Sequence, residues 1–212
     1  MPTRLAAFAL GAAGVLFLLY PTVRPWNDES TREGAVESMG SGAWVAAHLF
    51  AMIGFILVPL GLLVVSLLLR GTPGARLAPV AVVIAWIGVG LTLPYYGAED
   101  FALNTVANLA RAGEAIDVPA VADAFRYGPA ALTTFVLGLI LLGVGAVLAA
   151  IAIARSGALP PASGVLVAIG FALFIPQFFG PPAIRIAHGV VLAAGLIWLA
   201  IEVHRANRVA SV

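Results

Sequence analysis

The stretch AWVAAHLFAMIGFILVPLGLLVVSLLL, residues 43–69, decides the fold class, because it runs without one charged side chain. A helix needs roughly 20 apolar residues to cross the hydrocarbon core of a bilayer. Residues 43–69 therefore predict a membrane-spanning helix, and the rest of the chain can be interpreted around it.

Composition extends this prediction to the whole chain. Of 212 residues, 62% are hydrophobic and 10% are charged, against about 45–50% and about 25% in soluble domains. The lipid bilayer is thus the first expected partner. The chain has no cysteine, which excludes disulfides and thiolate metal sites, and its net charge of +1 gives no reason to expect a nucleic-acid partner.

The apolar runs predict an all-α integral membrane bundle of six transmembrane helices, forming a single domain over residues 1–212. The first run has no clear small-residue cleavage site before the polar segment that follows, so it is interpreted as a retained helix rather than a signal peptide. The six expected spans cover residues 5–20, 43–69, 77–96, 129–154, 162–178 and 184–203.

Arginine and loop length predict the orientation, since cytoplasmic loops carry an excess of basic residues. The side that holds both termini has short loops, six arginines and only Glu202 as an acid. We therefore expect a bacterial cytoplasmic (inner) membrane protein with both termini cytoplasmic. The arginines on that side are Arg4, Arg70, Arg76, Arg155, Arg205 and Arg208, and those opposite are Arg24, Arg32, Arg111, Arg126 and Arg185.

The opposite side carries nine of the ten acids and two long polar segments. Ser30 and Glu33 have the capping-box spacing, which predicts a short helix over residues 30–39 between the first two spans. Between the third and fourth spans, two short extracytoplasmic helices are expected, with a break near Gly113 and the second helix starting near Asp117 and Pro119.

Two segments of the chain also read as copies of one helix pair. Arg70 corresponds to Arg155 and Gly97 to Gly180, at offsets of 85 and 83 residues. Both copies read as helix, Arg, small-residue loop, helix, proline, two aromatics and glycine. Residues 43–97 and 129–180 would then be two parallel copies of one helix pair.

The polar residues of the chain converge on one depth of the predicted bundle. In LPYYGAEDFALNT, residues 93–105, the third span ends in adjacent carboxylates, Glu99 and Asp100. His48 and His188 each lie one turn inside a span on the same side, and helical rise places them about 6 Å below the interface. Polar groups at membrane depth are costly and frequently functional.

This convergence predicts a pocket open to the outer side that binds a small hydrophobic or amphipathic ligand. The candidate catalytic residues are Glu99, Asp100 and Asp28, and the candidate ligand-binding residues are His48, His188, Arg24, Trp26, Trp44, Tyr96, Gln177 and Phe178.

Each of these residues also has a structural explanation. A histidine near a helix end can be an interfacial residue with one hydrogen bond. Carboxylates at a helix start complement the helix dipole, and aromatic residues at this depth form the usual interfacial belt. The pocket is a hypothesis to be weighed against these explanations.

Four function classes stay open at this point. An intramembrane enzyme could use a buried carboxylic acid as proton donor, as terpene cyclases do, but only the architecture supports that analogy. His48 and His188 could ligate haem iron axially, or a divalent ion together with Glu99 or Asp100, although the chain has no local metal-binding motif and no metal site is predicted. A transporter or a non-catalytic subunit of a membrane complex are the other classes. The sequence identifies no cofactor and no protein partner.

Three stretches carry a family resemblance: LYPTVRPWNDEST (19–31), WVAAHLFAMIGF (44–55) and LTLPYYGAEDFAL (91–103). They resemble a family of multi-pass membrane proteins of high-GC bacteria that has no assigned activity. The resemblance implies a membrane fold and no mechanism. It falls on residues that depth alone also selects, namely Arg24, Asp28, Glu29, His48, Glu99 and Asp100.

Overall fold

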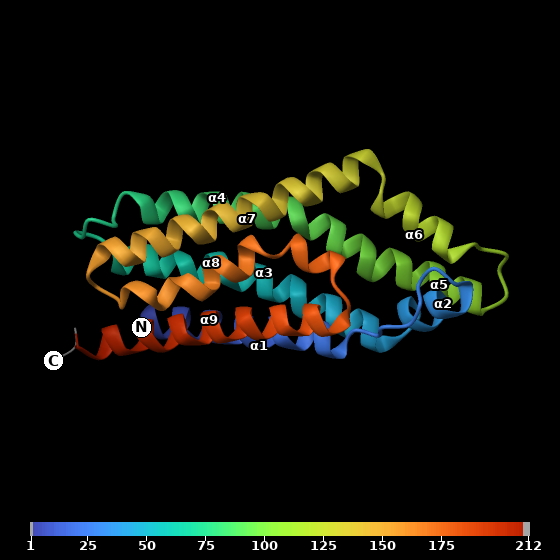
Figure 1. The fold of residues 1–212 in the computed structure, drawn as a ribbon, viewed down its shortest axis with the longest axis horizontal. Coiled ribbons are helices and arrows are strands. Elements are labelled where there is room, and N and C mark those ends of the chain that lie inside the picture. The colour runs from blue at the N-terminus through green and yellow to red at the C-terminus, as the bar shows by residue number, and fades with distance from the viewer. Residues whose placement is uncertain (1, 210–212) are drawn as a thin grey trace.

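The computed structural model describes residues 2–209, and it describes the side chains of residues 4–206; the Arg208 side chain counted above lies outside them. All regular structure in the described residues is helical. The helices lie side by side along one direction, and the first and last described residues lie at the same end (Figure 1).

The longest helices are α1 (Pro2–Val23), α3 (Gly42–Leu68), α4 (Leu77–Gly97), α7 (Pro129–Ser156) and α9 (Pro182–Val209). The shorter ones are α2 (Arg32–Met39), η1 (Ala98–Ala102), α5 (Leu103–Arg111), α6 (Val118–Arg126), η2 (Pro161–Gly164), α8 (Val165–Ala172) and η3 (Pro176–Phe179).

Five stretches of the described chain are helical for long enough, and apolar enough, to cross a membrane. They are Arg4–Val23, Gly42–Leu68, Leu77–Arg111, Pro129–Ser156 and Pro182–Ala206. The multi-pass membrane class that composition predicts is therefore supported by five helices of suitable length.

The expected sixth span, residues 162–178, is not one continuous helix. Its α-helical part, α8, has only eight residues and is flanked by the 3₁₀ turns η2 and η3. Pro160, Pro161 and Pro176 explain the interruptions, since proline lacks the N–H that continues a helix. The segment nevertheless packs along α7 and α9.

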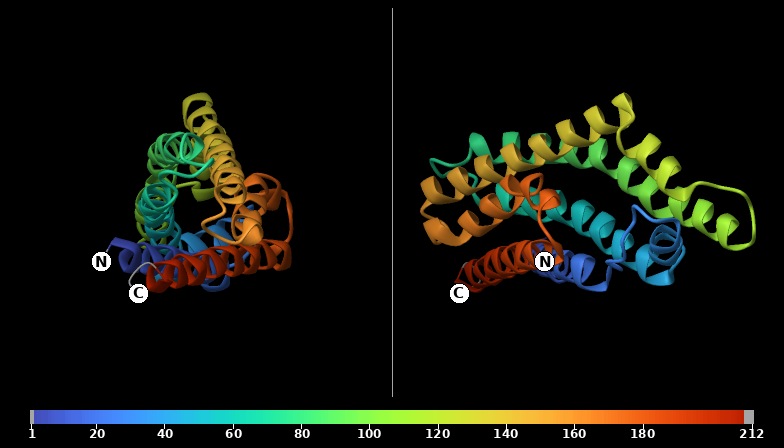
Figure 2. Two further views of the ribbon diagram at one scale, coloured as in Figure 1. Left: turned by 90° about the vertical axis from the view of Figure 1, so that its left-hand side faces the viewer. Right: turned by 45° about the vertical axis from the view of Figure 1, so that its right-hand side comes forward.

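The helices form a closed ring in which each one contacts the next. The packed pairs are α1 with α3, α3 with α4, α4 with α7, α7 with α8, α8 with α9, and α9 with α1. Figures 1 and 2 show α1 and α9 side by side along the bundle. The interior is apolar and aromatic, with Phe17, Phe55 and Phe174 all fully buried.

The helical path of α4 does not stop near residue 96, where the sequence predicts the third span to end. It continues through the π-helical turn η1 into α5, so Glu99 and Asp100 lie within one interrupted helix rather than at a helix start. The expected dipole interaction of these two carboxylates is therefore absent.

A small cap formed by α2, α5 and α6 lies at the end away from the termini (Figure 1). Its own apolar core includes Met39, Trp44 and Leu103. Helix α6 follows Asp117, whose side chain accepts a hydrogen bond from the Ala120 N–H, at the position that the sequence predicts. Helix α2 is capped by Thr31 rather than Ser30, because the Thr31 hydroxyl accepts from the Gly34 N–H.

Glycine allows the closest approach between α4 and α7. A Cβ atom added at Gly88 would lie 2.7 Å from both the Gly138 carbonyl oxygen and the Leu142 backbone nitrogen. Backbone atoms cannot move aside as a flexible side chain can. Because lipid tails give helices no hydrophobic reason to associate, such close packing is a main source of attraction between them.

Gly88→Ala should therefore lower the free energy of unfolding by about 1–3 kcal/mol, the typical cost of overpacking. Thermal unfolding of detergent-purified protein would measure the change. Gly90→Ala is the matched control, since a Cβ atom there meets nothing within 4 Å. Equal midpoints for the two variants would contradict this account of the α4–α7 contact.

Candidate functional site

A cavity of about 610 Å³ lies where the bundle meets the cap. Its charged walls come from the segment after α1, from η1, from α6 and from the start of α9. Its aromatic walls come from α1, α4, α7 and η3. The polar lining includes Arg24, Asp28, Glu29, His48, Glu99, Arg126 and Arg185, and the aromatic lining includes Tyr20, Trp26, Tyr95, Tyr96, Phe135 and Phe178.

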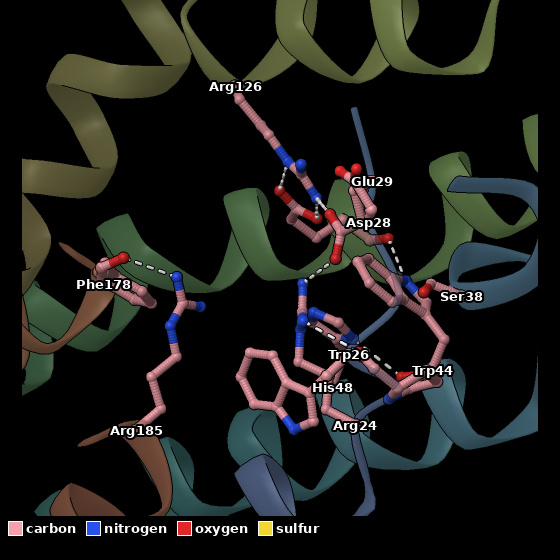
Figure 3. Close-up of polar contacts among 12 residues, drawn as sticks. Arg24, Trp26, Asp28, Glu29, Ser38, Trp44, His48, Arg126, Phe178 and Arg185 are labelled. Atoms are coloured by element: carbon pink, nitrogen blue, oxygen red, sulfur yellow. Dashed lines mark hydrogen bonds and ion pairs between the residues drawn. The ribbon is translucent and has the colours of Figure 1, made fainter. Parts of the chain in front are cut away.

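Four charged side chains form a continuous chain of ion pairs along one wall (Figure 3). Arg24 Nη2 lies 2.5 Å from Glu29 Oε1, and Arg126 Nη2 lies 2.9 Å from Glu29 Oε2. Arg126 also binds Glu99 with two parallel hydrogen bonds of 2.6 and 2.9 Å. Bidentate pairs of this kind hold both partners in one geometry.

Burial and ion pairing shift the pKa values of these side chains in opposite directions. Burial raises the pKa of Glu29, but the guanidinium groups of Arg24 and Arg126 outweigh it, so the pKa of Glu29 lies below its ordinary value of 4.5. Burial lowers the pKa of Arg126, and its pairs with Glu99 and Glu29 raise it by more. Both side chains are therefore charged at neutral pH.

Two tryptophans hold Arg24 in place. Its guanidinium carbon lies 4.5 Å from the ring centre of Trp26 and 4.7 Å from that of Trp44. Trp44 lies beneath the cavity rather than in its lining, and its indole N–H donates to the Glu99 carbonyl oxygen at 2.8 Å. Trp44 thus supports two members of the ion-pair chain at once.

Arg185 lies across the cavity from this chain (Figure 3) and forms no ion pair with a described residue. Its Nη2 donates to the Phe178 carbonyl oxygen at 2.6 Å. Its guanidinium carbon lies 5.3 Å from the Trp26 ring centre and 5.5 Å from that of Phe178. A half-buried cation held only by carbonyls and aromatic rings remains able to bind an anion.

His48 is buried and presents one nitrogen to the cavity region. Its Nδ1 lies 2.8 Å from the Trp44 carbonyl oxygen, which can only accept, so Nδ1 carries the hydrogen. In the neutral ring Nε2 is then an acceptor. The ring packs against Tyr20 and Tyr96, with centres 5.7 and 6.0 Å away.

Seven of the predicted site residues line this cavity: Arg24, Trp26, Asp28, His48, Tyr96, Glu99 and Phe178. Asp100, Trp44, Gln177 and His188 do not. Asp28 lies at the exposed rim, and hydrogen bonds from the Ser30 hydroxyl and N–H lower the pKa of its carboxyl group.

Asp100 faces away from the cavity although it is next to Glu99 in sequence. It is fully buried, and neither carboxylate oxygen has a hydrogen-bond partner among the described residues. Consecutive helical residues point about 100° apart, so one of the two carboxylates reaches the cavity and the other does not.

His188 lies in a different part of the bundle from His48. Its Nε2 lies 2.7 Å from the Gly170 carbonyl oxygen, and its ring packs edge-on against Phe174. Three aromatic rings, those of Phe174, Phe55 and Tyr96, separate it from His48 along one path of ring contacts. In the described residues, no group of three or more His, Cys, Asp and Glu side chains is placed to hold a metal ion.

Three charged residues of the lining, Glu29, Arg126 and Arg185, are absent from the predicted catalytic and ligand-binding residues, although the family resemblance falls on Glu29. The sequence does not connect Arg126 with Glu99, because Arg126 ends a short helix 27 residues further along the chain. The available signal was charge balance: an outer face with two adjacent carboxylates at membrane depth needs a cation nearby.

The chain was compared with protein-family models, with curated proteins and with solved structures, and no match was found in any of the three. The site must therefore be interpreted from its own geometry.

Replacing Arg126 should destabilise the fold. Arg126→Met leaves Glu99 without its partner and Glu29 with one cation instead of two. Because these groups are mostly buried, we expect a loss of about 1–3 kcal/mol in the free energy of unfolding, measured by thermal unfolding. Arg205→Met breaks the exposed pair with Glu202 and should cost about 0–1 kcal/mol. Similar losses in both variants would contradict the structural role of the chain.

The ion pairs of Glu29 also predict a pH dependence. Since folding lowers the pKa of Glu29 below 4.5, its contribution is present above that pH and is lost as the pH falls through the lowered value. The difference in unfolding midpoint between the native protein and Glu29→Gln should be largest near neutral pH and shrink below about pH 4.5. A difference that stays constant from neutral pH to acid would show that Glu29 is not stabilised in this way.

Proposed function

We propose that this protein is an inner-membrane protein of six passes, with the cavity open to the extracytoplasmic side, and that the cavity binds a small amphipathic ligand. The sixth pass is the broken segment of η2, α8 and η3. The short loops and the excess of arginine over acids at the end that holds the termini support a cytoplasmic location for that end.

The observation that carries the proposal is the mixed lining of one cavity. Ligand sites combine apolar and aromatic walls with a few fixed polar groups. Here Tyr95 and Phe135 stack with ring centres 4.0 Å apart, while the ion-paired arginines and Arg185 supply polar groups nearby. A ligand with an apolar body and a polar group matches both surfaces.

Binding fits this geometry better than acid catalysis does. Glu99 reaches the cavity, but both of its oxygens are held by Arg126. Asp28 is exposed and bonded to Ser30. Asp100 has free oxygens but does not line the cavity. None of the three carboxylates predicted as catalytic therefore combines access to the cavity with a buried acid group that lacks a partner.

Blocking the cavity tests the proposal. Val136 lines the cavity from α7, and a tryptophan at this position would fill part of it. Mass spectrometry of small molecules that co-purify with the native protein should identify an amphiphile. We expect Val136→Trp to retain at least about tenfold less of it, since a blocked site loses its apolar contacts.

Leu137→Trp is the matched control, because Leu137 is the next residue of α7, is 47% exposed and does not line the cavity. It should retain the ligand. The proposal is wrong if the native protein neither carries nor binds any amphiphile, or if both tryptophan variants lose it equally.

A further inference from the structure

A second hollow adjoins the cavity on the outside of the bundle. It is an apolar groove of about 340 Å³ between α7 and α8, whose walls include Ile140, Val144, Val147 and Phe171. Ile140, Val144 and Val147 are 39–49% exposed, so in a bilayer this groove faces lipid chains.

The groove and the cavity meet at one residue. Ile175 lines both of them. On α7 the residues at intervals of four form one row that winds slowly around the helix, because four residues are slightly more than one turn. Leu132 and Val136 of this row line the cavity, and Ile140, Val144 and Leu148 line the groove.

This row of residues is longer than one leaflet of a bilayer is deep. At 1.5 Å per residue, the distance along α7 from residue 132 to residue 148 is about 24 Å. One leaflet of a hydrocarbon core of ~30 Å is about 15 Å deep. The combined surface can therefore accommodate an extended hydrocarbon chain over the depth of a leaflet.

The charges that line the cavity balance, with three arginines, Arg24, Arg126 and Arg185, against three acids, Asp28, Glu29 and Glu99. Asp28 lies at the exposed rim, so the buried and half-buried part of the lining has one more cation than acids. Arg185 is the cation without an acidic partner among the described residues. The planar guanidinium fork suits carboxylate and phosphate oxygens.

We infer that the cavity and the groove together hold one anionic lipid. Its carboxylate or phosphate head binds Arg185, and its hydrocarbon chain leaves past Ile175 along α7. This inference rests on the proposed function and names the chemical class of the ligand. Because bilayer lipids solvate a hydrocarbon chain as well as apolar side chains do, the groove sets the direction of the chain, whereas Arg185 sets the affinity.

Photolabelling in lipid nanodiscs tests both ends of the ligand. The probe is a long-chain fatty acid with a diazirine at the end of its chain, and an alkyl phosphate of equal length with the same diazirine serves as a second probe. After irradiation, peptide mapping should place the label on residues 139–148 of α7. The fatty alcohol with the same chain and diazirine should label this stretch at least about tenfold less, since it lacks the charge that Arg185 binds.

Two pairs of variants separate head from chain. Arg185→Gln should reduce the α7 label about tenfold or more, whereas Arg76→Gln, an exposed site directly before α4 that does not line the cavity or the groove, should leave it unchanged. Val144→Trp should move the label away from residues 139–148, whereas Val83→Trp, at an equally lipid-facing site on α4 that is 57% exposed, should not. These groove and control sites are on the surface, so the fold should tolerate both tryptophans.

Several outcomes would overturn the inference. Label spread evenly over all lipid-facing helices, or equal label from the alcohol, would mean ordinary boundary lipid. Inorganic phosphate binding as tightly as the alkyl phosphate would mean that the ligand is a free anion. In either case, loss of the co-purifying ligand in Val136→Trp would still support the proposed function, so the two failures are distinguishable.

Discussion

The ion-pair chain Arg24–Glu29–Arg126–Glu99 is the constraint on which the cap end of the molecule depends. Its members come from three segments far apart in sequence: the loop after α1, the π turn that follows α4, and the end of α6. A partly buried charge that lacks its partner is costly. The three segments are therefore held in an arrangement in which each carboxylate meets an arginine.

On the other side of this ion-pair chain, the interior of the bundle is apolar and aromatic. Phe17 contacts Phe55, Phe171 and Phe174, with ring centres 5.1–6.1 Å apart, and glycines bring α4 and α7 into backbone contact. Aromatic and small residues pack without buried charge, so this part of the structure can be stable in lipid and serve as the fixed floor of the cavity. Among the described residues, the buried charged side chains, Arg24, Glu99 and Asp100, all lie where the bundle meets the cap.

The position of a residue along the helix axis was predictable from the sequence, and rotation about that axis was not. The apolar runs and the helical rise of 1.5 Å per residue place Arg24, His48, Tyr96 and Glu99 at one level, and the structure brings them to one cavity. Whether a side chain points into that cavity depends on how its helix is rotated by its neighbours.

Asp100 and His188 show this limit. Both were selected by their position along a helix, and neither side chain lines the cavity. The interrupted 162–178 segment shows another: its hydropathy resembles that of a span, whereas its prolines decide that no continuous helix forms. The predicted Ser30 cap was wrong for a smaller reason. Ser30 and Thr31 are both good capping residues, and only the path of the preceding loop distinguishes them.

The π turn Ala98–Ala102 joins two parts with separate cores. Helix α4 packs into the bundle, and α5 packs into the cap against α2 and α6, yet both belong to one helical rod from Leu77 to Arg111. Local π turns are points where a helix differs mechanically from its neighbours. The turn carries Glu99. One helical rod therefore places a carboxylate between the two cores, where it meets Arg126 of α6.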